Sequence, residues 1–190
     1  LNATMGEAIA TEARHAGVNW VLNPVLDLNY NPHNPVTNTR SFGDRPERLC
    51  RLIPPLIRAL QTHGVAATAK HFPGDGMDDR DQHLVSTVNN LPFAQWQETY
   101  GRVWQAAIEA GVMTVMPGHI SLPDYQGYRD DPEAAPPATI SRKLLTDLLR
   151  GELGFEGLIV SDSTSMVGLT SRVAPHKRAV TAVQAGIDVW

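Results

Sequence analysis

Histidines and carboxylates gather in one short polar segment, residues 70–83, which reads KHFPGDGMDDRDQH. It follows an apolar run, begins with Lys70 and His71, and ends with His83. Side chains of these types can act as nucleophile, proton donor and proton acceptor on a neutral substrate. A polar loop that leaves an apolar strand in this way predicts the rim of an active site.

Three other apolar runs also lead to an ionisable residue. Asp27 follows PVL, His119 follows VMPG, and Asp162 follows LIVS. A structural role in a loop explains Asp27 or His119 alone at least as well as a chemical role does. Because the carboxyl ends of parallel strands meet at one edge, the four runs together predict a single site.

Composition and motifs argue against several classes of function. The net charge of −4 provides no basic surface for nucleic acid, and no run approaches the roughly 20 apolar residues of a membrane span. No glycine-rich phosphate loop occurs, and neither Ser161 nor Ser163 lies in a G-x-S-x-G elbow. The single cysteine, Cys50, can form neither an internal disulfide framework nor a cysteine-based zinc site. These features favour a neutral substrate and predict no cofactor and no metal.

Alternating strands and helices must position these residues. Apolar runs predict strands near residues 18–28, 65–72, 112–118 and 157–162, with a fifth beginning at residue 187. Helical patterns lie between them, and the aromatic residues of 92–111 are predicted to be core. Pro54 and Pro55 should kink or split the helix that runs towards His63. Strands that are apolar on both faces indicate an α/β fold with a parallel sheet.

Loop lengths distinguish a barrel from an open sheet. Long polar loops follow the strands and tight turns follow the helices, as in a (β/α)8 TIM-like barrel. Only about five strands are visible, whereas such a barrel has eight and typically about 250 residues. Residues 1–190 are therefore predicted to be a single catalytic barrel domain that is incomplete at both ends.

Four stretches of the sequence carry a specific resemblance. In order, they read NPVLDLNYNPHNPVTNTRSFGDRPE, AKHFPGDGMDDRDQHL, PATISRKLLTDLLRGELGFEGLIVSDSTSM and AVQAGIDVW. Together they resemble the barrel domain of glycoside hydrolase family three, and within it the bacterial N-acetyl-β-glucosaminidase branch. The resemblance implies a carbohydrate substrate and a retaining, exo-acting enzyme that removes β-linked N-acetylglucosamine or a related sugar from the non-reducing end. It further implies a covalent glycosyl-aspartate intermediate and a role in peptidoglycan recycling.

The same resemblance assigns catalytic roles. Asp162 ends a segment similar to the nucleophile motif G-F-x-G-x-[IV]-x-[ST]-D. Asp81 and His83 match an Asp-x-His acid/base dyad, in which the carboxylate orients the imidazole and raises its basicity. A contact between residues two apart requires a cooperating loop backbone, and Gly74 and Gly76 would let the loop bend and carry His83 over the sugar.

Sugar-binding roles are implied for Lys70, His71 and Arg40, which match residues that bind hydroxyl groups in the family. Adjacent side chains on a regular strand point to opposite faces. If Lys70 and His71 both bind sugar, we expect the backbone to leave the pleat between residues 70 and 72, through strained dihedrals or a cis bond at Phe72–Pro73. Asp75 departs from the branch, because a histidine is usual at that position.

Several alternatives remain open. Within sugars, the chain could belong to a β-glucosidase-like or xylosidase-like exo-enzyme, or to a phosphorolytic enzyme, since a histidine acid/base does not repel an anionic acceptor. A non-catalytic sugar-binding homologue is a further alternative. A metallohydrolase would draw on oxygen and nitrogen ligands, and its candidate ligands are Asp78, Asp79, Asp81 and His83 with His71 or His119.

Two expectations concern the whole protein. The resemblance places closing strands and a further acidic sugar-binding residue upstream, so residues 1–190 by themselves are predicted not to be a competent glycosidase. The sequence leaves the oligomeric state and the location undetermined, with the cytoplasm favoured.

Overall fold

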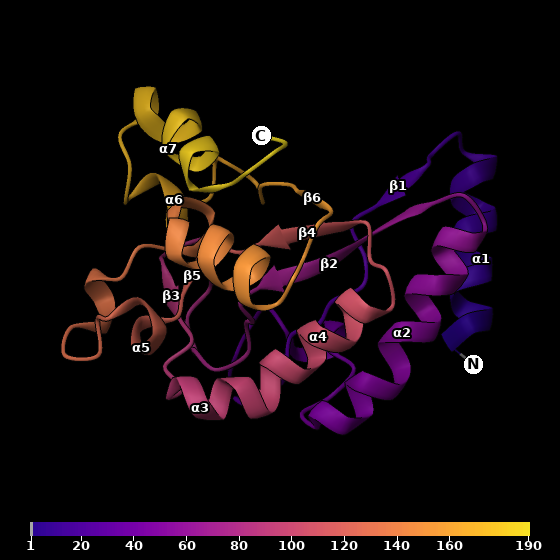
Figure 1. The fold of residues 1–190 in the computed structure, drawn as a ribbon, viewed down its shortest axis with the longest axis horizontal. Coiled ribbons are helices and arrows are strands. Elements are labelled where there is room, and N and C mark those ends of the chain that lie inside the picture. The colour runs from indigo at the N-terminus through magenta and orange to yellow at the C-terminus, as the bar shows by residue number, and fades with distance from the viewer. Residues whose placement is uncertain (1) are drawn as a thin grey trace.

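A parallel sheet forms the centre of the computed structural model, which describes residues 2–190 (Figure 1). Its strands are β1 (Trp20–Val21), β2 (Ala66–Phe72), β4 (Thr114–Pro117) and β6 (Leu158–Ile159), in the order β1-β2-β4-β6. All neighbouring strands are parallel. The predicted fifth strand appears as one parallel bridge, Val160 to Val189. The predicted parallel α/β architecture is therefore confirmed.

Helices connect the strands. The longer ones are α1 (Asn2–His15), α2 (Pro46–Thr62), α4 (Arg102–Glu109), the π-helix η5 (Lys143–Glu152) and α7 (Arg178–Ala185). The π-helical turn η2 (Gln97–Gly101) joins α3 (Phe93–Trp96) to α4, while α5 (Pro123–Gln126) and α6 (Val167–Thr170) are single turns. Short 3-10 turns are η1 (Asn38–Arg40), η3 (Pro132–Ala134), η4 (Ala138–Ile140) and η6 (Pro175–Lys177). In Figure 1, α2 and α4 lie along one side of the sheet and α7 lies at the opposite side.

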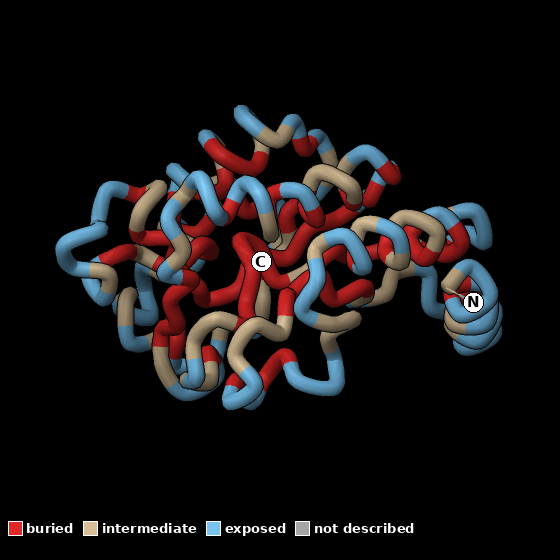
Figure 2. Tube along the Cα trace, turned by 90° about the horizontal axis from the view of Figure 1, so that it is seen from below, coloured by how far each residue is buried: buried red, intermediate tan, exposed pale blue. Residues whose placement is uncertain are grey.

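Aromatic side chains fill the core between the sheet and these helices. Trp96, Tyr100 and Trp104 are fully buried, as their helical spacing predicted. Phe72, at the end of β2, packs edge-to-face on Trp96 and Trp104, with ring centroids 6.3 and 5.1 Å away. Figure 2 shows this buried interior surrounded by exposed helices and loops. Such burial and edge-to-face packing stabilise the end of the strand that carries the polar loop.

Of the two outcomes predicted for Pro54 and Pro55, a kink or a split, the split is wrong. Helix α2 is one continuous element that includes both prolines. Its apolar face, with Leu49, Ile53 and Leu56 among its buried residues, belongs to the core. Packing of that face offsets the loss of two backbone donors, because tertiary contacts supply most of a helix's stability.

The predicted strand at residues 18–28 is only partly regular. Pro24 has no N–H to donate, and the ladder of β1 ends at Val21. The chain nevertheless stays beside β2, because Val25 bridges Lys70 and the Leu26 N–H donates to the Lys70 carbonyl at 2.6 Å. This alignment brings Asp27 to the carboxyl end of β2.

A second sheet, which the sequence did not predict, closes the loop region. It contains only β3 (Thr87–Val88) and β5 (Ile120–Ser121), which pair in parallel. The pairing ties the end of the polar loop to the segment that follows β4. No helix formed by residues 2–190 is both long and apolar enough to span a membrane.

Candidate active site

The carboxyl end of β2 leaves regular strand geometry where the site begins. The pairing of β2 with β4 shifts register between Lys70 and Phe72. The peptide bonds Lys70–His71 and Phe72–Pro73 are both cis. The predicted departure from the pleat is therefore confirmed, and the cis bond at Lys70–His71 is an addition to it.

Glycines shape the polar loop that follows. Gly74 and Gly76 have φ values of +128° and +103°, which side-chain-bearing residues rarely adopt. A Cβ atom on Gly74 would overlap the ring of Tyr100, and one on Gly76 would overlap the carbonyl oxygen of Leu28. The loop thus turns tightly against the core before it reaches the acid/base candidates.

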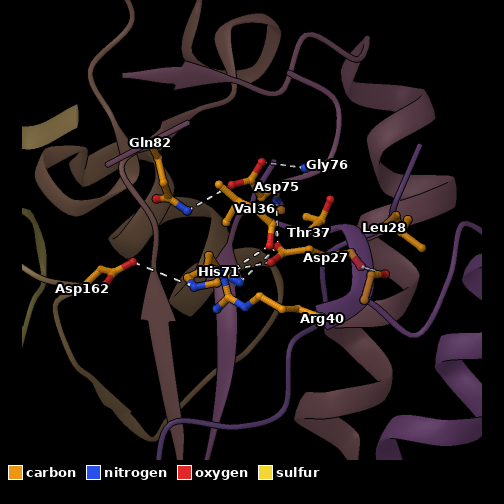
Figure 3. Close-up of polar contacts among 12 residues, drawn as sticks. Asp27, Leu28, Val36, Thr37, Arg40, His71, Asp75, Gly76, Gln82 and Asp162 are labelled. Atoms are coloured by element: carbon orange, nitrogen blue, oxygen red, sulfur yellow. Dashed lines mark hydrogen bonds and ion pairs between the residues drawn. The ribbon is translucent and has the colours of Figure 1, made fainter. Parts of the chain in front are cut away.

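Asp27 and His71 form a buried pair (Figure 3). The Asp27 Oδ2 lies 2.7 Å from the His71 Nδ1, and its Oδ1 accepts hydrogen bonds from the backbone N–H groups of His71 and Asp75. Burial alone would raise the pKa of Asp27, but His71 and the two backbone donors hold that pKa below its ordinary value. The pair orients the imidazole, because Nδ1 faces Asp27 and Nε2 is left to face the site.

Asp162, the predicted nucleophile, lies opposite that imidazole. Its Oδ2 is 3.9 Å from the His71 Nε2, and its Oδ1 accepts a hydrogen bond from the Ser163 N–H at 2.7 Å. Within residues 2–190 no hydrogen bond is made to the Oδ2, and 18% of the side chain is exposed. One oxygen is therefore held while the other has free lone pairs, which suits attack on an electrophilic carbon.

The two predicted sugar-binding cations lie at the same rim. Lys70 is half-buried; burial and the charge of Arg40 lower its pKa, although the carboxylates of Asp162 and Asp27 oppose this. Arg40 is exposed and donates only a long hydrogen bond, 3.4 Å, to the Val36 carbonyl. Neither side chain has a carboxylate partner within 4.0 Å among the residues described. Both cations thus have donors available for a ligand.

Asp81 and His83, the predicted acid/base dyad, are in contact. The Asp81 Oδ1 lies 2.6 Å from the His83 Nδ1 and also accepts the His83 backbone N–H at 2.8 Å. The Leu84 and Val85 N–H groups both donate to the Asp81 carbonyl, which closes the turn. The imidazole is 55% exposed and its Nε2 makes no hydrogen bond within the described chain. A histidine held at one nitrogen and open at the other can donate and accept a proton.

His119 bonds to the chain around it, as expected for the structural role in a loop that the sequence allowed. Its Nε2 lies 3.0 Å from the Ser163 carbonyl oxygen and its Nδ1 lies 2.9 Å from the Thr139 hydroxyl. Because a carbonyl only accepts, Nε2 must carry the proton. Burial lowers the pKa of His119 and favours this neutral form. The buried ring thereby supports the backbone beside Asp162.

Two further residues of the site were not assigned by sequence reasoning. Asp75 is buried and bonded by Asn34, Gly76 and Gln82, and Gln82 is 1% exposed. Burial and the nearby charge of Asp27 raise the pKa of Asp75 to about 6. The one feature of the sequence that could have pointed to these two residues is that Asp75 replaces the histidine usual in the family branch.

The geometry does not favour the metallohydrolase alternative. Residues 2–190 contain no group of three or more His, Cys, Asp or Glu side chains arranged to hold a metal ion. Asp78 is instead paired with Arg80 at 2.6 Å, Asp81 with His83 at 2.6 Å, and His71 with Asp27 at 2.7 Å.

Comparison with known proteins identifies the family. The model of the glycosyl hydrolase family 3 N-terminal domain matches residues 1–190. The chain belongs to glycosyl hydrolase family 3. The resemblance stated from the motifs is thus confirmed at the level of the family, and the parallel sheet corresponds to part of the family 3 barrel domain.

Three known proteins are especially similar to this chain. A β-N-acetylglucosaminidase/β-glucosidase of Cellulomonas fimi is 47% identical over 96% of this chain. The solved structure of a β-glucoside phosphorylase, BglX, is 42% identical over 99% of this chain, with a TM-score of 0.94. That of a β-N-acetylglucosaminidase from Paenibacillus sp. str. FPU-7 is 36% identical over 99% of this chain, with a TM-score of 0.92. The chain spans only 33%, 34% and 35% of these three relatives.

Proposed function

We propose that the protein containing this family 3 chain is a retaining, exo-acting glycosidase that removes β-linked N-acetylglucosamine from non-reducing ends. The observation that carries the proposal is the unbonded Oδ2 of Asp162 beside the His71 imidazole, at the carboxyl end of β2; His83 lies in the loop that follows this strand. The relatives named as β-N-acetylglucosaminidases support the choice of sugar. Peptidoglycan recycling would be a natural use of this activity.

In the first step, the Asp162 Oδ2 attacks the anomeric carbon and the bond from that carbon to the leaving oxygen breaks. The His83 Nε2–H donates its proton to the leaving oxygen, and the Asp81 carboxylate stabilises the imidazolium before transfer. The products are a glycosyl ester on Asp162 and the released alcohol.

In the second step, His83 Nε2 takes a proton from water while the water oxygen attacks the anomeric carbon. Asp162 leaves as a carboxylate, so two inversions retain the configuration. Lys70, Arg40 and the His71 Nε2 would bind sugar hydroxyls, and binding at these groups holds the anomeric carbon near Asp162.

Trapping of the intermediate tests this proposal. A 2-deoxy-2-fluoro glycoside with a good leaving group should label the natural full-length protein, and peptide mapping should find the sugar on Asp162. A label on any other residue would contradict the assignment, and binding without labelling or turnover would favour a non-catalytic sugar-binding protein.

Phosphorolysis is the second candidate, supported by the free cations Lys70 and Arg40 and by the similarity to a β-glucoside phosphorylase. Phosphate would replace water in the second step, and a histidine acid/base repels it less than a carboxylate would. Product analysis in phosphate buffer distinguishes the two, because phosphorolysis yields the sugar 1-phosphate and hydrolysis yields the free sugar. Comparison of N-acetylglucosaminides with glucosides in the same assay tests the choice of sugar.

A further inference from the structure

The residue between the two members of the acid/base dyad is itself buried. Gln82 is 1% exposed, whereas the side chains of its neighbours Asp81 and His83 are 29% and 55% exposed. The Gln82 carbonyl accepts the Gly168 N–H of α6 at 3.2 Å. A Cβ on Gly168 would lie 2.5 Å from that carbonyl oxygen, so the packing there is close. The turn that presents His83 is thus anchored through Gln82.

The Gln82 side chain bridges two other elements. Its Nε2 donates to the Asp75 Oδ2 at 3.0 Å, and its Oε1 accepts the backbone N–H of His119, after β4, at 2.9 Å. Figure 3 shows Gln82 reaching towards Asp75, which lies beside the Asp27–His71 pair. The bridge therefore connects the acid/base turn to the buried half of the site.

Donors and acceptors along this bridge can be arranged in only one way. A backbone N–H can only donate, so the Gln82 Oε1 must face His119 and its Nε2 must face Asp75. Asp75 also receives the Gly76 N–H at 2.7 Å and the Asn34 amide at 2.9 Å. All three groups around the carboxylate are donors, which favours its ionised form although burial opposes this.

We propose that Gln82, held by the Asp75 carboxylate, is a positioning residue that fixes the Asp81–His83 pair for proton transfer. The inference rests on the proposed glycosidase function and gives a role to the departure from the family pattern at Asp75. It explains how residues two apart in a loop remain in contact, because the intervening side chain is held by separate elements.

The donor and acceptor pattern provides an exchange test. In Asp75→Asn, the new amide would direct a donor at the Gln82 Nε2, and a flip of Gln82 would direct a donor at the His119 N–H. In Gln82→Glu, two carboxylates would face each other. In the double variant, the carboxylate introduced at position 82 can accept from both the amide introduced at position 75 and the His119 N–H. The bridge is then restored with its charge moved from position 75 to position 82.

The variants should be made in the natural full-length protein and assayed on glycosides with poor and with activated leaving groups. Each single variant should lose about 10- to 100-fold in kcat on the poor leaving group and much less on the activated one, because protonation matters less there. The double variant should recover most of the loss. Asp78→Asn is the matched control, since this carboxylate lies in the same loop but is paired with Arg80, and its leaving-group dependence should equal that of the parent.

A second readout does not depend on turnover. Nitrogen-15 NMR of the His83 ring reports its tautomer, and the contact with Asp81 should favour Nδ1–H in the neutral ring of the parent protein. We expect a mixture of tautomers in each single variant and recovery in the double variant. Single variants that match Asp78→Asn in both readouts, or a double variant no better than the singles, would overturn the inference. A restored NMR signature in a protein that cleaves no glycoside would instead reject the proposed function alone.

Discussion

Two aspartate–histidine pairs lie at or just beyond the carboxyl end of β2, in different environments. Asp27 and His71 are 44 residues apart in sequence and 2.7 Å apart at their bonded atoms, whereas Asp81 and His83 are two residues apart and 2.6 Å apart. The side chains of the first pair are 1% and 5% exposed, and those of the second are 29% and 55% exposed. The contact is nearly the same, but its surroundings are not.

Burial, rather than the length of the contact, suits the two pairs to different tasks. The Asp27 carboxylate has three donors around it, so the His71 ring is held with its Nε2 directed towards Asp162. The His83 ring is more exposed, and its Nε2 makes no hydrogen bond within residues 2–190. A buried pair suits positioning, and an exposed pair suits proton exchange.

The largest effect should come from Asp162, the carboxylate that the buried pair faces. Under the proposed mechanism Asp162→Asn removes the charge that forms the glycosyl bond, so kcat should fall by roughly 10³-fold or more. Affinity for the free sugar, measured by calorimetry, should change little because the amide keeps the shape of the side chain. A variant with turnover within tenfold of the parent would remove Asp162 from the mechanism.

Removal of the exposed imidazole should have the next largest effect. His83→Ala should cost about 10²- to 10⁴-fold with a poor leaving group, the usual contribution of a general acid. An activated aryl leaving group departs without protonation, so its loss in the glycosylation step should be far smaller. Equal losses on both substrates in single-turnover kinetics would show that His83 is not the acid.

Breaking the buried pair should lower the free energy of unfolding more than breaking the exposed pair. Asp27→Asn leaves His71 without its buried carboxylate and should lower the free energy of unfolding by about 3 to 5 kcal/mol. Asp81→Asn breaks a more exposed contact and should cost about 1 kcal/mol or less. Urea unfolding of both variants beside the parent measures the difference, and similar costs would mean that burial does not distinguish the pairs.

The pH dependence contributed by Asp75 should be smaller than the cost of breaking the buried pair. Its pKa is raised from 3.8 to about 6 by burial and by Asp27, so the folded state binds the proton more tightly than the unfolded state. The stability from this proton is complete below pH 3.8 and is lost as the pH rises through about 6. The lowered pKa of Asp27 acts in the other direction, and only at lower pH, where its contribution is lost on acidification.

The measurement compares unfolding of the parent and Asp75→Asn between about pH 4 and pH 7. The stability of the parent relative to the variant should decrease by about 2 kcal/mol over that interval. Groups far from Asp75 cancel in the difference, and Asp27, whose pKa is lowered, titrates below this interval. A difference that is constant with pH would show that Asp75 does not titrate there.

The positions of the main-sheet strands along the chain could be predicted from the sequence, because apolar runs and polar loops alternate, although the observed strands are mostly shorter than the apolar runs. The short pair β3 and β5 could not, since each strand is only two residues long and its pairing depends on loops packed by other elements. The continuity of α2 through Pro54 and Pro55 likewise depended on the face that it packs against the core.

The sequence by itself determined the family, the parallel α/β fold and the candidate residues Asp162, Asp81 and His83, because these depend on motifs local in the chain. Only the tertiary structure decided the partners of Asp27, His119 and Gln82. Each of these contacts joins residues from different strands or loops, and burial of a polar side chain stabilises the fold only where such a partner is present. A local sequence pattern indicates which ionisable side chains are present, whereas tertiary packing determines which of them are hydrogen-bonded and which remain free to react.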